Sequence, residues 1–139
     1  MESKFESRIG KVRQSAAVIY NWLSDFRNFT GLIPVDKIKN WQATADECHF
    51  TVDMVGDTGL KIVEKEEAKL IKITTIGDNP YNFFFWIQLK EVAPYDTRIK
   101  LTLKLDLNPM LRMMAAKPIQ NFLDSLIDQM EKNVVLNHP

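Results

Sequence analysis

The chain has 139 residues, of which 45% are hydrophobic and 26% are charged, and its 18 basic residues balance its 18 acidic residues. This length is enough for one domain with a buried core. A net charge of zero provides no bulk electrostatic attraction for nucleic acid, so we expect no nucleic-acid partner.

The N-terminal sequence predicts neither export nor membrane insertion. Residues 1–10 alternate charged and apolar side chains and lack the apolar core of a signal peptide. No apolar run reaches the roughly 18 residues that can span a bilayer. The single Cys48 cannot form an internal disulfide, which favours a reducing compartment. We therefore expect a cytoplasmic protein without an integral membrane segment.

The first third of the chain predicts one strand and two short helices. Lys4–Val12 has the apolar character of a strand. Ser15 is a suitable N-cap for a helix that ends near Asp25, because the apolar residues after it recur at spacings of three and four. A second short helical piece is expected at Phe26–Leu32.

The middle of the chain changes to strands separated by turns at intervals of roughly 8 to 12 residues, which is typical of an antiparallel sheet. Gly56–Gly59 is one of the predicted turns, and Gly77–Pro80 is another. Alternation is clear in Phe50, Val52 and Met54. The six predicted strands are Asp36–Thr44, Cys48–Val55, Leu60–Lys65, Leu70–Ile76, Asn82–Val92 and Thr97–Leu107.

The last predicted strand and the helix after it have the strongest patterns. Leucine or isoleucine occupies every second position from Ile99 to Leu107, so one face of this strand is buried and the other is wet. Asn108 as N-cap and Pro109 at the first helical position then start a long amphipathic helix. Pro118 predicts a kink or a break near Lys117. Residues 1–3 and about 134–139 are expected to fray.

The order of these elements is one strand, two short helices, six strands and a terminal helix. This order is similar to that of START-like (SRPBCC, helix-grip) proteins. The opening of these proteins also resembles residues 5–9 and residues 15–29 of this chain, the latter ending in Asp25-Phe26-Arg27-Asn28-Phe29 and followed by Pro34. The resemblance covers Lys4 to about Val134. It implies an α+β fold in a single domain, residues 1–139, with a seven-stranded curved antiparallel sheet closed over the C-terminal helix. It also implies an apolar ligand between sheet and helix.

The first hypothesis for function is therefore the binding of a hydrophobic or amphipathic small molecule, lipid-like, polyketide-like or isoprenoid-like. We chose the residues expected to line the cavity in two ways. On the strands they are the alternate residues that face inward, and on the helix they are the apolar residues on the face toward the sheet. They are Phe50, Val52, Ile73, Phe83, Phe85, Leu101, Leu103, Met114, Phe122 and Leu126. Met110, Met113 and Met114 suit either an adaptable pocket or an irregular core.

The second hypothesis is an enzyme of the polyketide cyclase or dehydratase type, and the sequence favours it less. Such chemistry needs a titratable side chain inside the cavity. The polar residues worth inspecting are Asn40, Gln42, Glu64 and Thr75, and none is assigned as catalytic. No cofactor is implied. No metal site is expected, because His49 and His138 are far apart and Cys48 has no second ligand at a metal-binding spacing.

The third hypothesis is a protein-interaction or homodimerisation surface. Alternation within Phe83–Trp86 turns Phe84 and Trp86 to the outer face of the sheet. Two exposed aromatic residues side by side are typical of a partner surface. Long neighbouring side chains could instead cover them.

Overall fold

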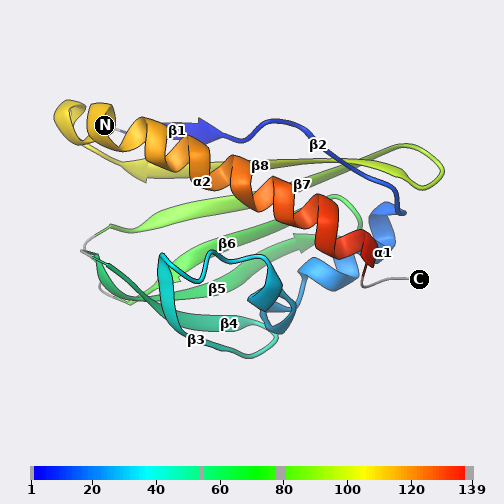
Figure 1. Cartoon of the computed structure of the whole chain (residues 1–139), viewed down its shortest axis with the longest axis horizontal. Helices are drawn as coiled ribbons and strands as arrows, with labels where there is room; N and C mark the ends of the chain where they lie inside the picture. The colour runs from blue at the N-terminus through cyan, green and yellow to red at the C-terminus, as the bar shows by residue number, and fades with distance from the viewer. Residues whose placement is uncertain (1, 54, 78–80, 137–139) are drawn as a thin grey trace.

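The computed structural model describes residues 2–53, 55–77 and 81–136 of the chain. Its elements follow the predicted order and form an α+β fold, a curved antiparallel sheet with a long C-terminal helix (Figure 1). The strands are β1 (Glu2–Glu6), β2 (Gly10–Val12), β3 (Ile38–Ala43), β4 (Glu47–Val52), β5 (Gly56–Glu66), β6 (Leu70–Ile76), β7 (Phe83–Ala93) and β8 (Asp96–Asp106). The helices are α1 (Ala16–Leu23), the 3-10 helix η1 (Phe26–Gly31) and α2 (Pro109–Leu136).

The sheet has the strand order β1-β8-β7-β6-β5-β4-β3, with β2 also paired to β8. All of its pairings are antiparallel. Helix α2 runs diagonally across one face of the sheet (Figure 1), and near its C-terminal end the Asn133 side chain donates to the Gly31 carbonyl of η1 at 3.4 Å. Among the described residues, no helix combines the length and the apolar character needed to cross a bilayer. The sheet and α2 therefore form two layers with the core between them.

The predicted first strand is divided into β1 and β2, so the sheet has eight strands where the sequence predicted seven. Both pair with β8, at different levels: Phe5 lies opposite Leu103, and Gly10 lies opposite Ile99. Between them the backbone N–H of Ser7 donates to the Leu101 carbonyl, and the Ser7 hydroxyl accepts from the Leu101 N–H, both at 2.9 Å. The serine side chain replaces one rung of the ladder, and this frees the next residues to bend toward α2.

That bend lets the N-terminal segment hold α2 through polar contacts. Arg8 forms ion pairs with Asp128 and, at 2.7 Å, with Glu131. Glu131 also accepts the Lys11 backbone N–H at 2.9 Å, while Asp124 accepts that of Arg8 at 2.8 Å. The guanidinium of Arg8 lowers the pKa of Glu131 below its ordinary value, and the two carboxylates raise the pKa of Arg8. We call this group of five residues the Arg8 clamp.

The glycines around residue 56 have roles other than the predicted turn. The β4–β5 connection lies earlier, because Val52 pairs with Gly56, which has a φ of +103° and is the first residue of β5. Gly59 is inside the strand, where a Cβ atom would come within 2.8 Å of the His49 ring. Residues 56–59 are therefore strand, with glycine required for a positive φ at one end and for close approach at the other. Met54 and residues 78–80 of the next predicted turn lie outside the described residues.

Helix α2 starts as predicted, since the Leu111 N–H donates to the Asn108 side-chain oxygen at 2.9 Å. The helix does not break at Pro118. Its inward face packs on both sides of the proline, and this packing outweighs the lost backbone hydrogen bond. Fraying at 134 is also not observed, because Val134 is fully buried and α2 continues to Leu136. At the other end, Glu2 and Ser3 are paired in β1 rather than frayed.

Candidate functional site

A cavity of about 550 Å³ lies between the concave face of the sheet and the first half of α2. Its volume falls in the range of small-molecule sites, about 300–1,000 Å³. The lining residues come from every strand from β3 to β8, from η1, from α2 and from the segments that connect these elements. They are Phe26, Phe29, Ile33, Lys37, Ile38, Trp41, Phe50, Val52, Val55, Thr58, Leu60, Ile73, Tyr81, Phe83, Phe85, Leu103, Leu105, Leu107, Leu111, Met114, Ala115, Ile119, Phe122, Leu123 and Leu126.

Strand parity creates the cavity wall. Phe85 pairs with Ile73 on one side and with Leu103 on the other, so one transverse row of the sheet supplies three lining side chains. Trp41 and Phe50 extend the wall to the sheet edge as stacked rings with centroids 5.8 Å apart. Large apolar side chains on a strongly curved face cannot all reach a straight helix, and the space between them remains open.

The structure brings nine of the ten predicted residues to this cavity: Phe50, Val52, Ile73, Phe83, Phe85, Leu103, Met114, Phe122 and Leu126. Leu101 does not line it. Leu101 faces inward as parity predicts, but it lies opposite Ile87 and both side chains are fully buried in the core. The alternation of a strand gives the direction of each side chain. Whether the side chain borders a cavity depends on how closely its neighbours pack in front of it.

The sequence did not single out the β3 side of the wall. Ile38 and Trp41 both line the cavity, although their spacing of three breaks the alternation of a strand. The register of β3 against β4 shifts between Lys39 and Gln42, and Asn40 has a φ of 56°. This bulge turns both apolar residues inward. Helical spacing did offer a signal for Leu111, Ala115 and Ile119, which continue the stripe of Phe122 toward the N-terminus of α2.

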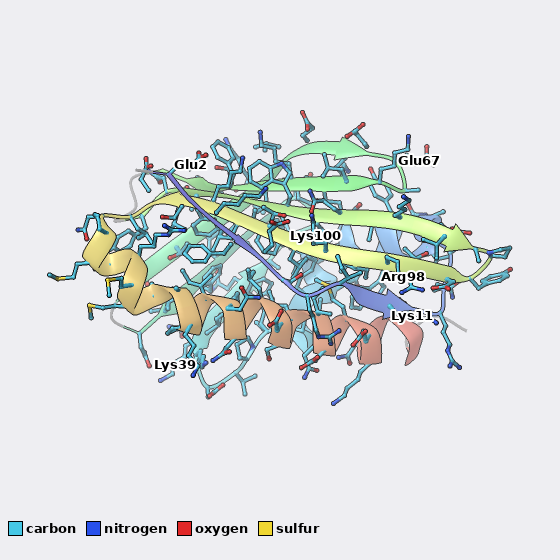
Figure 2. All side chains as sticks on the ribbon, turned by 90° about the horizontal axis from the view of Figure 1, so that it is seen from above. Glu2, Lys11, Lys39, Glu67, Arg98 and Lys100 are labelled. Atoms are coloured by element: carbon cyan, nitrogen blue, oxygen red, sulfur yellow. The ribbon has the colours of Figure 1, made fainter. Side chains whose placement is uncertain are left out.

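The three methionines at the start of α2 do not fill the core. Met110, Met113 and Met114 are 71%, 82% and 69% exposed, and of the three only Met114 lines the cavity. Sulfur-bearing side chains project from the first turns of α2 (Figure 2). On the helix side, Met114 therefore borders the cavity with an exposed, flexible apolar side chain.

Several solved structures have a similar fold over nearly the whole chain. Norcoclaurine synthase from Thalictrum flavum, in complex with dopamine and hydroxybenzaldehyde, is 15% identical with a TM-score of 0.74, covering 100% of this chain and 89% of the other. A START superfamily protein from Mycobacterium smegmatis is 15% identical with a TM-score of 0.71, covering 96% and 98%. A conserved protein from Geobacillus kaustophilus is 11% identical with a TM-score of 0.76, covering 100% and 98%.

The chain has the START-like, helix-grip fold. No family model matches the sequence, and no curated protein matches it. Identities of 10–15% establish the fold and leave the activity to the residues of the site.

Few polar groups reach the helix-grip cavity. Among its described lining residues, only Lys37, Thr58 and Tyr81 carry an ammonium or hydroxyl group, and none carries a carboxylate. The other polar residues considered for catalysis lie elsewhere. Asn40, Gln42 and Glu64 are exposed, and the Thr75 hydroxyl donates to the Asn82 side-chain oxygen at 3.0 Å. The cavity offers apolar contact rather than a constellation of acids and bases.

Cysteine and histidine chemistry is not assembled either. Cys48 is fully buried, and desolvation raises the pKa of its thiol to about 12. A thiol in this state is a small core side chain and a poor nucleophile. His49 is exposed, and His138 lies outside the described residues. In the part of the chain that the structure describes, no three His, Cys, Asp or Glu side chains converge as a metal site would need.

The outer face of the sheet carries the predicted aromatic pair. Phe84 is 43% exposed and Trp86 is half-buried, with ring centroids 5.9 Å apart. The Lys72 ammonium lies 4.6 Å from the Phe84 centroid, and that of Lys104 lies 5.4 Å from the Trp86 centroid. Both rings point outward as predicted, and two lysines partly cover them through cation–π contacts. Figure 2 shows further basic side chains, Arg98 and Lys100, along β8.

Proposed function

We propose that this START-like domain binds a hydrophobic or amphipathic small molecule, lipid-like, polyketide-like or isoprenoid-like, in the cavity between its sheet and α2. The observation that carries the proposal is the cavity of about 550 Å³ with an almost entirely apolar lining. Apolar burial contributes about 25 cal/mol per Å² of surface removed from water, so a ligand that fills this space is held mainly by the hydrophobic effect. The nine predicted lining residues are the proposed contacts.

Gentle purification followed by organic extraction and mass spectrometry tests the proposal directly. We expect a co-purifying apolar compound, released in stoichiometric amount. A second measurement uses N-phenyl-1-naphthylamine, a neutral dye whose fluorescence rises in apolar sites. We expect saturable binding with one site per chain. Protein that is empty after extraction and that also fails to bind the dye would overturn the proposal.

The cyclase or dehydratase alternative depends on the same cavity and needs a general acid or base within it. Lys37 and Tyr81 are the only titratable side chains among the lining residues that the structure describes, and both are exposed. The lining therefore supports a binding role more than a catalytic one. Turnover of a bound carbonyl compound that Lys37→Gln or Tyr81→Phe abolishes would favour the enzyme.

The exposed Phe84 beside Trp86 supports a second candidate, a homodimer formed through the outer sheet face. Replacement of Trp86 by Lys places a charge within that surface and would halve the mass of such a dimer in light scattering. Val92→Lys, at a 50% exposed position of the same strand, is the matched control. A wild-type monomer in solution would exclude this version of the interaction. The cytoplasmic location remains a prediction from the sequence.

A further inference from the structure

The polar groups of the cavity lining include one cation, and no anion is found among the described lining residues. Among the described residues that line the cavity, Lys37 has the only charged side chain, since the remaining polar groups are the hydroxyls of Thr58 and Tyr81 and the indole of Trp41. Thr58 is buried, at 8% exposure, whereas Lys37 and Tyr81 are exposed. An amphipathic occupant would therefore meet apolar walls along its length and one positive charge at the exposed margin.

Local backbone structure fixes the position of this lysine. The backbone N–H groups of Lys37 and Ile38 both donate to the Pro34 carbonyl, at 3.1 and 3.0 Å, in the turn that leads into β3. Ile38 also lines the cavity. The stem of Lys37 can follow this apolar wall while its ammonium stays in water, as long basic side chains commonly do at apolar boundaries.

The ammonium of Lys37 forms no ion pair among residues 2–53, 55–77 and 81–136, whereas that of Lys39 lies 3.8 Å from a carboxylate oxygen of Asp53. Figure 2 shows Lys39 at the edge of the molecule, and this residue does not line the cavity. The two lysines are two positions apart and differ in both respects. The charge of Lys37 is thus available to a ligand.

We propose that the preferred ligand is a singly charged anionic amphiphile, a carboxylate on a long apolar chain, with its head group at Lys37 and its chain in the cavity. This inference rests on the proposed binding function. A carboxylate placed deep in the apolar cavity would lose its hydration without a partner, whereas at Lys37 it keeps both water and a counter-charge. One ammonium balances one negative charge. A phosphate monoester dianion would keep an unbalanced charge, and a cationic amphiphile would be repelled.

Displacement of N-phenyl-1-naphthylamine at about pH 8 tests the head-group preference with three ligands of one chain length: dodecanoate, 1-dodecanol and dodecylammonium. We expect the wild-type protein to bind dodecanoate most tightly and dodecylammonium least tightly. Lys37→Gln should weaken dodecanoate about three- to fivefold, as expected for one exposed ion pair, and leave dodecanol unchanged. Lys37→Glu should reverse the order of the two charged ligands.

Lys39→Glu is the matched control, because it makes the same change of charge outside the cavity and should keep the wild-type order. Equal affinities of wild type and Lys37→Gln for dodecanoate would overturn the inference, as would an equal loss in Lys39→Glu. In those cases binding of dodecanol would still support the proposed function. Failure of the dye and of all three ligands to bind would instead overturn the binding function itself.

Discussion

The two halves of α2 face the same sheet but differ in packing: the C-terminal half packs against the core, and the N-terminal half borders the cavity. In the C-terminal half Ile127, Met130 and Val134 are at most 1% exposed and do not line the cavity, and η1 lies beside the end of the helix, where the Asn133 side chain donates to the Gly31 carbonyl at 3.4 Å. In the N-terminal half the inward residues border the cavity and are only half-buried; they are Leu111, Ala115 and Ile119. We call these the closed end and the open end. Close packing at one end of a helix allows incomplete packing at the other.

Charge follows the same division. All three acidic residues of the Arg8 clamp lie in the C-terminal half of α2. The first three turns of α2 contain Arg112 and Lys117 but no acidic residue. The N-terminal segment of the chain therefore fixes the closed end by polar contacts as well as by burial. In the N-terminal half of α2, Gln120 contacts this segment through a neutral side-chain amide, which donates to the Glu6 carbonyl at 2.8 Å.

The largest expected difference is in the loss of stability when a side chain is shortened to alanine at the closed end or at the open end of α2. Ile127→Ala removes a fully buried side chain and should lower the free energy of unfolding by about 3 kcal/mol. Phe122→Ala removes a half-buried side chain that already borders a cavity, so we expect a loss of about 1–2 kcal/mol in spite of its larger size. Urea denaturation of both variants measures this. Equal losses would contradict the division of α2.

A second prediction concerns the close approach of β2 to α2. A Cβ atom on Gly10 would lie 2.6 Å from Cγ2 of the buried Ile127, so Gly10→Ala must shift the helix or the strand. We expect a loss of about 2 kcal/mol in unfolding free energy. At Gly31 the nearest atom to such a Cβ is a side-chain oxygen of Asn133 at 3.6 Å, an ordinary contact. Gly31→Ala is therefore the control and should change stability little.

At the open end a substitution should change binding more than stability. Ala115→Trp places a large ring where Ala115 borders the cavity, and we expect dye affinity to fall about tenfold or more while unfolding free energy changes little. Met113→Trp adds the same ring at an 82% exposed position that does not line the cavity. Fluorescence titration should show unchanged binding for this control. Undiminished affinity in Ala115→Trp would place the dye elsewhere.

The smallest predicted effect is the pH dependence of the Arg8 clamp. Because the pKa of Glu131 is lowered in the folded state, its contribution to stability is present above its ordinary value of 4.5 and is lost as pH falls through the lowered value. Glu131→Gln should cost about 1 kcal/mol at neutral pH. The difference from wild type should disappear in acid.

Asp128→Asn is the control for this prediction, since the Asp128 side chain is 56% exposed against 29% for Glu131 and accepts no backbone N–H from the residues that the structure describes. We expect a smaller loss at neutral pH. Thermal unfolding of both variants at several pH values measures the effect. A Glu131→Gln variant whose deficit persists unchanged in acid would show that charge is not the cause.

Local sequence determined most elements of the fold. Ser15 and Asn108 cap their helices as expected, because a capping side chain needs only the N–H groups of the next turn. Alternation in Phe83–Trp86 placed two rings inward and two outward, because side-chain direction in a strand has a period of two. These features depend on neighbours within a few residues.

The tertiary structure decided what depends on distant partners. The first strand is divided because Ser7 bonds to Leu101, and α2 passes Pro118 because both of its halves pack on the sheet. The sequence indicated that Leu101 and Leu103 both face inward, and only the packed fold shows that Leu103 meets the cavity while Leu101 meets the core. Sequence determines the direction of each side chain. Whether space remains in front of it depends on the curvature of the sheet and on where α2 is held.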